Sequence, residues 1–234
     1  MEMWSGEFFE AKAVLFDLDG TLLDTELLST QAIAKVIAPH GGKIEWELKK
    51  RLLGLKGPDW SRLVIQDQGL EGKLTPEELV EGWESHLAAL YPSVLKLPGA
   101  EELSSHLAQR GIPQALCTSS SRHAVALKRE AHREMFDRFQ VVVTGDDQEL
   151  QRGKPAPDIF LLGAKRLGVD PASCIVFEDA LSGCQAGKAA GMKVIAIPDT
   201  RLDVSVFKPY ADQVLTSMLH FKPEQFGLPA FLSP

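Results

Sequence analysis

The sequence has no long apolar run and no excess of basic charge. No uninterrupted apolar stretch approaches the roughly 18 residues that a membrane helix requires, and the first residues lack the basic start of a secretory signal. The 25 Lys and Arg residues are outnumbered by 32 Asp and Glu residues, which gives a formal net charge of -7 and no electrostatic reason to expect nucleic acid. We therefore predict a cytoplasmic protein with neither a membrane nor a nucleic-acid partner. The sequence does not indicate its oligomeric state.

Cysteine is also scarce. The three cysteines, Cys117, Cys174 and Cys184, are odd in number, and two of them lie in or beside apolar runs, which predicts reduced core thiols rather than a disulfide framework. The six histidines show no zinc-ligand spacing, and no Ser-His-acid order is recognisable. With 234 residues, of which 44% are hydrophobic, the chain can form one large domain or one domain that carries an insertion.

What the sequence does contain is an alternation of β-rich runs and helical patterns from residue 13 onward. This alternation predicts an α/β fold with a doubly wound, Rossmann-like parallel sheet covered by helices. Helices over residues 99–110 and 158–167 are expected to end at Gly111 and Gly168, because glycine is common just past a helix end. The predicted strands are 13–16, 114–117, 140–143, 174–177 and 193–197, with a weaker run at 212–215.

The segment from residue 25 to residue 92 interrupts this alternation, since it contains no convincing strand and at least three helical stretches. Within it, Thr75-Pro76-Glu77-Glu78 supplies an N-cap, a first-turn proline and a capping-box glutamate, and apolar residues then share one helix face. We therefore predict an α/β core of residues 1–24 and 93–234, with an inserted α-helical cap of residues 25–92.

Two carboxylates follow the first predicted strand. Asp17 comes directly after residues 13–16, Asp19 is two positions further on, and Gly20 permits the turn that would let both face one pocket. Open α/β sheets place their binding sites at the carboxyl ends of their strands. For an isolated pair of this kind, a solvated Asx turn at the strand end is the commoner interpretation.

Polar residues also follow three other predicted strands. Thr118 and Ser119 follow the second strand, Lys154 follows the third after a short loop, and the pair Glu178-Asp179 ends the fourth. Each has a simple structural interpretation on its own, as a helix N-cap, a surface cation or an acidic pair beside a helix dipole. Together they would place a hydroxyl, an ammonium and four carboxylates at one face of one sheet.

The four motifs DLDGTLLDTE, LCTSSS, GKPAPDIF and VFEDALSGCQAGKAAGM resemble, in combination and order, those of the haloacid dehalogenase superfamily. The resemblance covers essentially the whole chain and is specific to small-molecule phosphatases with a helical cap after the first motif. The C-terminal stretch ADQVLTSMLHFKPEQFGLPAF is most similar to a eukaryotic branch that includes pseudouridine-5'-phosphatase, glycerol-3-phosphatase and FMN phosphatase enzymes.

The resemblance implies a phosphomonoesterase that hydrolyses a small metabolite such as a nucleoside, sugar or polyol phosphate or FMN. Asp17 would be the nucleophile that forms an aspartyl phosphate, and Asp19 would protonate the leaving alcohol and then activate the hydrolytic water. Lys154, the Thr118 hydroxyl and the Ser119 amide would bind the phosphoryl oxygens. An acid at position 19 favours phosphate esters over carbon–halogen bonds, because an alkoxide leaving group needs a proton.

Charge also argues for a metal ion. A carboxylate about 4 Å from a phosphate dianion meets a repulsion of about 8 kcal/mol at an effective dielectric constant of about 20, so a cation must offset it. The resemblance implies that Asp17, the backbone carbonyl of Asp19, Asp179 and Glu178 form the metal site, Glu178 directly or through water. Such an all-oxygen set suits Mg²⁺.

Two other functions are compatible with the same motifs. A phosphomutase of the β-phosphoglucomutase type would return the phosphoryl group to a sugar instead of to water, because cap closure rather than the motifs decides this partition. A catalytically silent protein would only bind phosphorylated metabolites. The second is disfavoured, because every acid, cation and hydroxyl that the chemistry requires is present.

Two features outside the motifs allow weaker interpretations. In the cap, the turn at residues 53–60 has Lys56 and Trp60, which would offer the leaving group a cation and a stacking surface. A solvated turn with Trp60 buried in the cap is equally compatible with this pattern. In the core, the stretch from Lys128 to Arg138 interleaves basic and acidic residues, which predicts a solvated helix face.

Overall fold

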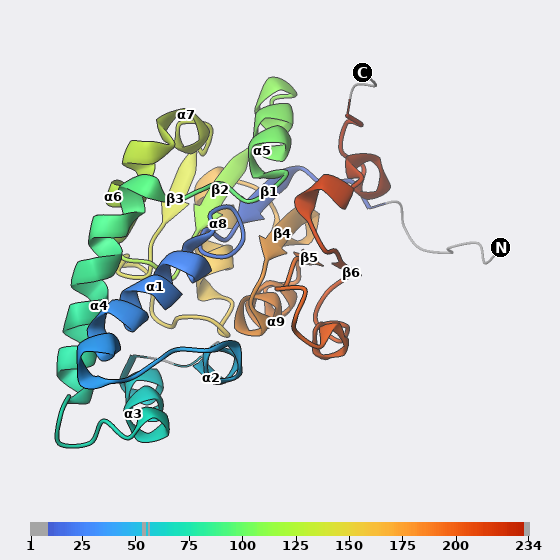
Figure 1. Cartoon of the computed structure of the whole chain (residues 1–234). Coiled ribbons are helices and arrows are strands. Elements are labelled where there is room, and N and C mark those ends of the chain that lie inside the picture. Colours follow the sequence, from blue (N-terminus) through green and yellow to red (C-terminus); the bar gives the residue numbers. More distant parts are fainter. Residues whose placement is uncertain (1–8, 53–54, 56, 232–234) are drawn as a thin grey trace.

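The computed structural model describes residues 9–52, 55 and 57–231, and these are organised around a six-stranded sheet (Figure 1). The strands are parallel throughout, in the order β3-β2-β1-β4-β5-β6. Their bounds are β1 Ala13–Phe16, β2 Gln114–Cys117, β3 Val141–Val143, β4 Cys174–Glu178, β5 Lys193–Ala196 and β6 Gln213–Val214. The chain proceeds outward from β1 to β3 on one side and from β4 to β6 on the other. The topological switch point therefore lies between β1 and β4, and the predicted fold class is confirmed.

Helices cover both faces of the sheet, because the strands carry apolar side chains on both. Val14 and Phe16 belong to one hydrophobic cluster, and Ala13 and Leu15 belong to another, as the alternation of side chains along a strand requires. All four residues of β1 are completely buried, which is typical of parallel sheets with helices on both faces. The covering helices are α5 Ala100–Gln109, α6 Arg122–Ala131, α7 Arg133–Phe136, α8 Asp158–Leu167 and α9 Leu181–Ala189.

Between β1 and α5, the described part of the chain forms four further α-helices. They are α1 Thr25–Ile37, α2 Trp46–Leu52, α3 Gly57–Gln68 and α4 Pro76–Leu90, and they share a hydrophobic cluster of their own, which includes Ile37, Val64 and Leu79. The predicted capping box is present at the start of α4: the Glu78 N–H donates to Thr75 Oγ1 at 3.2 Å, and the Thr75 N–H donates to Glu78 Oε2 at 2.8 Å. Both bonds satisfy donors that would otherwise be unpaired at the helix start.

The two stretches of chain that lead into and out of this helical segment lie side by side. The Asp24 N–H donates to Leu95 O, and the Leu97 N–H donates to Leu22 O, each at 2.9 Å. These bonds join the two connecting stretches, residues 22–24 and 95–97, at the edge of the sheet where β1 ends. The helical segment is thus attached next to the residues that follow β1.

The predicted elements match the structure except at a few ends. β3 begins at Val141 rather than at residue 140, β4 extends by one residue to Glu178, and β5 ends at Ala196 rather than at residue 197. The weak sixth run is confirmed as β6, although the strand is Gln213–Val214 rather than 212–215. Short 3-10 helices complete the chain: η1 Ala38–His40, η2 Tyr91–Ser93, η3 Pro171–Ser173, η4 Val204–Phe207, η5 Met218–His220 and η6 Pro223–Phe226.

The scarce cysteines are core residues, as predicted. All three are free thiols in the interior, and burial raises the pKa of the Cys117 thiol to about 12. None of the helices in the described part of the chain combines the length and the apolar character needed to span a membrane.

Candidate active site

The predicted catalytic groups meet at the carboxyl edge of the sheet, beside the switch point. Asp17 follows β1 and Glu178 ends β4, and these two strands are adjacent because Phe16 pairs with Phe177 in register. The Asp17 N–H donates to Phe177 O at 3.0 Å, so the pairing continues into the site. Side chains that leave neighbouring strands at the same edge point into the same crevice.

Lys154 lies at the centre of this group, although it comes from the loop between β3 and α8. Its Nζ donates to Asp17 Oδ1 at 2.5 Å, to Glu178 Oε1 at 2.6 Å and to the Cys117 carbonyl at 3.1 Å, which uses the three N–H donors of the ammonium group. The charge also lies 5.1 Å from the centre of the Phe160 ring. Burial by itself would lower the pKa of Lys154, but the two carboxylates raise it above its ordinary value. Lys154 is therefore a permanent cation of the site.

Three carboxyl groups lie close together here, and two of them, Asp17 and Glu178, contact this cation. Oxygens of Asp17, Glu178 and Asp179 lie within 4.8 Å of one another. Burial raises the pKa of Asp17 to about 7, an effect that Lys154 opposes and Glu178 reinforces. Burial also raises the pKa of Asp179 well above its usual value, with contributions from Glu178 and Asp17. The single ammonium of Lys154 does not offset this concentration of acid, and a closely spaced set of oxygen donors fits Mg²⁺. The metal-binding role of these residues, including the Asp19 carbonyl, stays a prediction.

Two glycines make room for the carboxylates. Gly20 has a φ of +84°, and a Cβ atom there would lie 2.3 Å from Asp179 Oδ2. Gly183, in α9, packs against Glu178 so closely that a Cβ atom would lie 1.8 Å from Oε1. Thr21 adds a hydrogen bond of 2.9 Å from its hydroxyl to Asp179 Oδ1. The acid cluster therefore depends on backbone that approaches it without side chains.

Asp19 occupies a separate polar environment. Its Oδ2 accepts hydrogen bonds from Ser120 Oγ at 2.7 Å and from Thr118 Oγ1 at 3.3 Å, and its Oδ1 accepts one from Lys128 Nζ. Burial would raise the pKa of Asp19, but the Lys128 ammonium and the hydroxyl donor hold it below its usual value. The two acids of the first motif thus have different surroundings: the pKa of Asp17 is raised and that of Asp19 is lowered.

The contact with Lys128 corrects one of our sequence predictions. The stretch 128–138 was predicted to be a solvated helix face, and this is wrong for Lys128, whose side chain is 0% exposed. Arg129 does follow the prediction, since it is exposed and pairs with Asp137. The available signal was helical spacing: Lys128 lies three residues after the buried Val125 and so shares its face.

The two predicted phosphate-binding residues that follow β2 differ in exposure. Thr118 is completely buried, and its hydroxyl faces Asp19 while also accepting a hydrogen bond from the Ser120 N–H at 3.0 Å. Ser119 is exposed. Their roles toward phosphate stay predictions, as does that of Lys154.

The two predicted specificity residues are placed differently from the motif residues. Lys56 lies outside the described residues. Trp60 is 8% exposed and belongs to the hydrophobic cluster of the helical segment, with its ring 5.3 Å from that of Trp83 in an edge-to-face arrangement. This placement corresponds to the alternative interpretation, a tryptophan buried in the cap, and a role in specificity stays a prediction for both residues.

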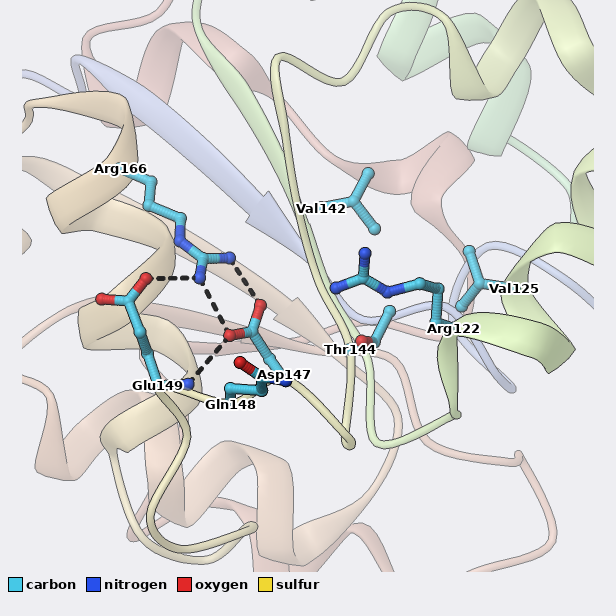
Figure 2. A pocket seen from close by; sticks show the side chains of 8 residues that line it. All are labelled: Arg122, Val125, Val142, Thr144, Asp147, Gln148, Glu149 and Arg166. Atoms are coloured by element: carbon cyan, nitrogen blue, oxygen red, sulfur yellow. Dashed lines mark hydrogen bonds and ion pairs between the residues drawn. The ribbon is translucent and has the colours of Figure 1, made fainter.

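A pocket of about 430 Å³ opens elsewhere, between β3, α6 and α8 (Figure 2). Its acid Asp147 accepts hydrogen bonds from Arg166 at 2.6 and 2.9 Å, and Arg166 also contacts Glu149. Nearby, Asp146 accepts hydrogen bonds from Thr144 Oγ1 and from the Arg122 N–H. These acids stabilise the loop after β3, and the pocket lining contains none of the motif residues.

Comparison with known proteins agrees with this geometry. Residues 11–191 match the family of haloacid dehalogenase-like hydrolases. The mitochondrial (DL)-glycerol-3-phosphatase 1 of Arabidopsis thaliana is 44% identical over 221 residues, which cover 93% of this chain and 74% of the relative. A probable pseudouridine-5'-phosphatase of Drosophila melanogaster is 42% identical over 220 residues, which cover 93% of this chain and 94% of the relative.

The fold is likewise similar to that of a solved phosphomutase. The crystal structure of β-phosphoglucomutase from Clostridium difficile superposes with a TM-score of 0.72 at 25% sequence identity. The superposition covers 92% of this chain and 94% of the other.

Proposed function

Because the chain belongs to the haloacid dehalogenase-like hydrolases, we propose that it is a Mg²⁺-dependent phosphomonoesterase that hydrolyses a small phosphorylated metabolite through an aspartyl phosphate. The observation that carries this proposal is the buried ion pair between Lys154 and Asp17, with Glu178 on the other side of the same ammonium. A carboxylate nucleophile must stay ionised, and a phosphate dianion must be able to approach it. A fixed cation beside the carboxylate favours its ionised form and reduces its repulsion from the phosphate.

In the first half of the reaction, a carboxylate oxygen of Asp17 attacks phosphorus. The new bond from Asp17 to phosphorus forms as the bond from phosphorus to the alcohol oxygen breaks, and Asp19 gives that oxygen a proton. Lys154 stabilises the negative charge on the phosphoryl oxygens. The products are a free alcohol, a phosphorylated Asp17 and an ionised Asp19.

In the second half, water replaces the alcohol. Asp19 removes a proton from a water molecule whose oxygen attacks phosphorus, the bond from phosphorus to Asp17 breaks, and inorganic phosphate leaves. The low pKa of Asp19, beside Lys128 and Ser120, favours the ionised form that this half requires. Asp17 returns to the carboxylate form, and Asp19 is protonated again for the next turnover.

The metal contributes charge. Asp17, Asp179 and Glu178 would hold Mg²⁺, with the backbone carbonyl of Asp19 as a further ligand, and the bound ion would neutralise charge on the phosphoryl oxygens. Glu178 already accepts hydrogen bonds from Lys154 and from the Ala180 N–H at 3.1 Å, so its contribution is compatible with a bond through water.

We also propose that residues 25–92 act as a cap over a core of residues 1–24 and 93–234. In support, the helical segment has its own hydrophobic cluster and is attached beside the residues that follow β1. The groups assigned to phosphate all come from the core, so the cap would contact the leaving group. The similar relatives named for glycerol-3-phosphate and pseudouridine-5'-phosphate support a polyol or nucleoside phosphate as the substrate.

The proposal is tested by measuring phosphate release from a panel of esters. Glycerol 3-phosphate, pseudouridine 5'-phosphate, FMN and several sugar phosphates are each incubated with the purified protein and Mg²⁺. We expect turnover of at least one ester, its loss in a chelator and its recovery when Mg²⁺ is restored. Ca²⁺ should restore little, because its longer and looser coordination fits an in-line displacement poorly. Full activity in the chelator would remove the metal from the mechanism, and tight binding of an ester without turnover would favour a binding protein.

A phosphomutase is the second candidate, and the similarity to β-phosphoglucomutase favours it. Product analysis separates the two functions. With a hexose 1-phosphate as substrate, a phosphatase releases free hexose and inorganic phosphate, whereas a mutase yields the isomeric hexose phosphate. We expect inorganic phosphate to be the product.

A further inference from the structure

Lys128 is a lysine with no access to solvent, and it touches three parts of the chain. Its Nζ donates to Asp19 Oδ1 in the loop after β1 and to Ser120 Oγ, at 2.8 Å, in the loop after β2. The same Nζ lies 4.7 Å from the centre of the Tyr91 ring, where the helical segment returns to the core. Ser120 in turn donates to the second carboxylate oxygen of Asp19 at 2.7 Å.

Such a placement needs an explanation, because burying an ammonium group costs several kcal/mol unless a partner and further hydrogen bonds compensate it. An apolar side chain would satisfy the packing of α6 at this position, as Val125 does one turn earlier. The basic neighbours Arg129 and Arg133 instead remain on the surface in exposed ion pairs. The partner of Lys128 therefore accounts for its burial, and that partner is Asp19.

Each acid of the first motif consequently has an ammonium of its own. Lys154 holds Asp17, and Lys128 holds Asp19. Lys128 and Ser120 donate hydrogen bonds to different oxygens of the Asp19 carboxylate, which fixes the rotation of that group about its Cβ–Cγ bond. An acid that serves both the leaving oxygen and the attacking water must be oriented toward both.

We propose that Lys128 is a positioning residue for the phosphoryl-transfer reaction: with Ser120, it fixes the Asp19 carboxyl group for proton transfer. This inference rests on the proposed phosphomonoesterase function. Lys128 is fully buried behind Asp19, so it acts through that carboxyl group and does not contact the substrate. Loss of Lys128 should slow the two steps in which Asp19 donates or accepts a proton. Substrate binding should be spared.

Leaving-group chemistry separates this role from a structural one. An alkyl ester such as glycerol 3-phosphate needs a proton on its departing oxygen, whereas p-nitrophenyl phosphate departs as a stable phenolate. Values of kcat/KM report only the steps through alcohol release, and they therefore isolate the first half of the reaction. A variant with a disoriented Asp19 should lose more kcat/KM on the alkyl ester than on the aryl ester.

The test uses Lys128→Met, which keeps the length of the side chain and removes the ammonium, with Arg129→Met as the matched surface control. We expect the kcat/KM ratio of alkyl to aryl ester to fall at least about tenfold in Lys128→Met, which is part of the roughly 10²–10⁴-fold that general acid catalysis contributes. KM for the alkyl ester should change little, because substrate binding is spared. The aryl ester should also show a burst of p-nitrophenol, because hydrolysis of the aspartyl phosphate becomes slow. Arg129→Met should match the parent in all three measurements.

Two further variants keep the test decisive if Lys128→Met does not fold. Ser120→Ala removes the second hold on Asp19, and Lys128→Arg keeps the charge. We expect Ser120→Ala to lower the kcat/KM ratio of alkyl to aryl ester. Lys128→Arg should keep this ratio closer to that of the parent than Lys128→Met does. Equal losses on both esters, without a burst, would overturn the role of Lys128 and leave the phosphatase function intact. Absence of turnover in the parent protein would instead overturn the proposed function, and the inference with it.

Discussion

The guanidinium carbon of Arg201 lies 3.6 Å from the centre of the Trp46 ring. This stacking joins the loop after β5 to the first turn of α2, and thus the sheet to the helical segment. The same guanidinium donates hydrogen bonds to both carboxylate oxygens of Asp199, at 2.9 and 2.5 Å. On the same face of α2, Lys49 pairs with Glu26 at 2.8 Å, and the charge of Glu26 contributes to the raised pKa of Asp179. The two contacts dock α2 beside the acid cluster.

Replacing Trp46 by Ala should therefore weaken the docking of the cap. An exposed cation–π contact contributes about 0.5–1 kcal/mol, which corresponds to about a two- to fivefold rise in KM for the preferred ester. Trp46→Phe keeps a ring under Arg201 and should give a smaller rise. Steady-state kinetics on both variants measure the difference, and an unchanged KM in Trp46→Ala would show that this contact does not hold the cap.

Asp17→Asn tests the nucleophile. The amide preserves the shape of the side chain but removes the charge that attacks phosphorus, so the variant should fold and lose activity by at least about 10³-fold, the scale of removing a nucleophile. Phosphate release from the preferred ester is compared with that of a mock preparation. Activity clearly above the mock would assign the nucleophile to another residue.

Lys154→Ala tests charge compensation at the same acid. Without the ammonium, Asp17 and Glu178 face each other and the substrate phosphate with only the metal to offset them, so kcat should fall at least about 10²-fold even at saturating Mg²⁺. The control is Lys165→Ala, because Lys165 is exposed and pairs with Glu149 at 3.2 Å. A turnover number equal to that of the parent would contradict the role of Lys154.

Gly183→Ala should impair the site although it favours the helix. Alanine stabilises a helix interior by about 1 kcal/mol over glycine, but its Cβ would lie 1.8 Å from Glu178 Oε1, so the carboxylate must move. We expect a weaker affinity for Mg²⁺ and a lower kcat. Gly153→Ala is the matched control, because an added Cβ there meets nothing within 4 Å. Equal Mg²⁺ affinity in both variants, by titration calorimetry, would place Glu178 outside the metal site.

The pKa shifts predict how stability depends on pH in the metal-free protein. Burial raises the pKa of Asp17 to about 7 and also raises that of Asp179, whereas an unfolded Asp titrates at about 3.9. The folded protein therefore binds more protons than the unfolded chain between these values. The free energy of unfolding should therefore fall as the pH rises from about 4 to about 7, by about 1.4 kcal/mol for each unit of pKa shift.

Thermal unfolding in a chelator measures this dependence, and Asp17→Asn should flatten it. Added Mg²⁺ should raise the Tm more at about pH 7.5 than at about pH 5, because protons compete with the ion for the carboxylates. A Tm increase that is the same at both pH values would argue that these acids do not hold the ion.

Much of this architecture could be predicted from local sequence. The apolar runs specify buried parallel strands, Thr75 and Glu78 specify the start of α4, and Gly168 marks the end of α8, since each depends on neighbours a few residues away. The convergence of Asp17, Thr118 and Glu178 was also predictable, because strands of a parallel sheet end at one edge. The cluster of charged residues at that edge could therefore be predicted from the sequence.

Tertiary structure decided which charged side chains are buried and what they contact. In the sequence, Lys128 belongs to a run of mixed charges and differs little from Arg129, yet one is sealed against Asp19, 109 residues away, while the other is exposed. The tight fit of Gly183 against Glu178 and the stacking of Arg201 on Trp46 are similarly invisible to periodicity. A repeating pattern reports only which face of an element is buried. The free energy of burying a charge depends on its partner, and folding alone brings that partner within reach.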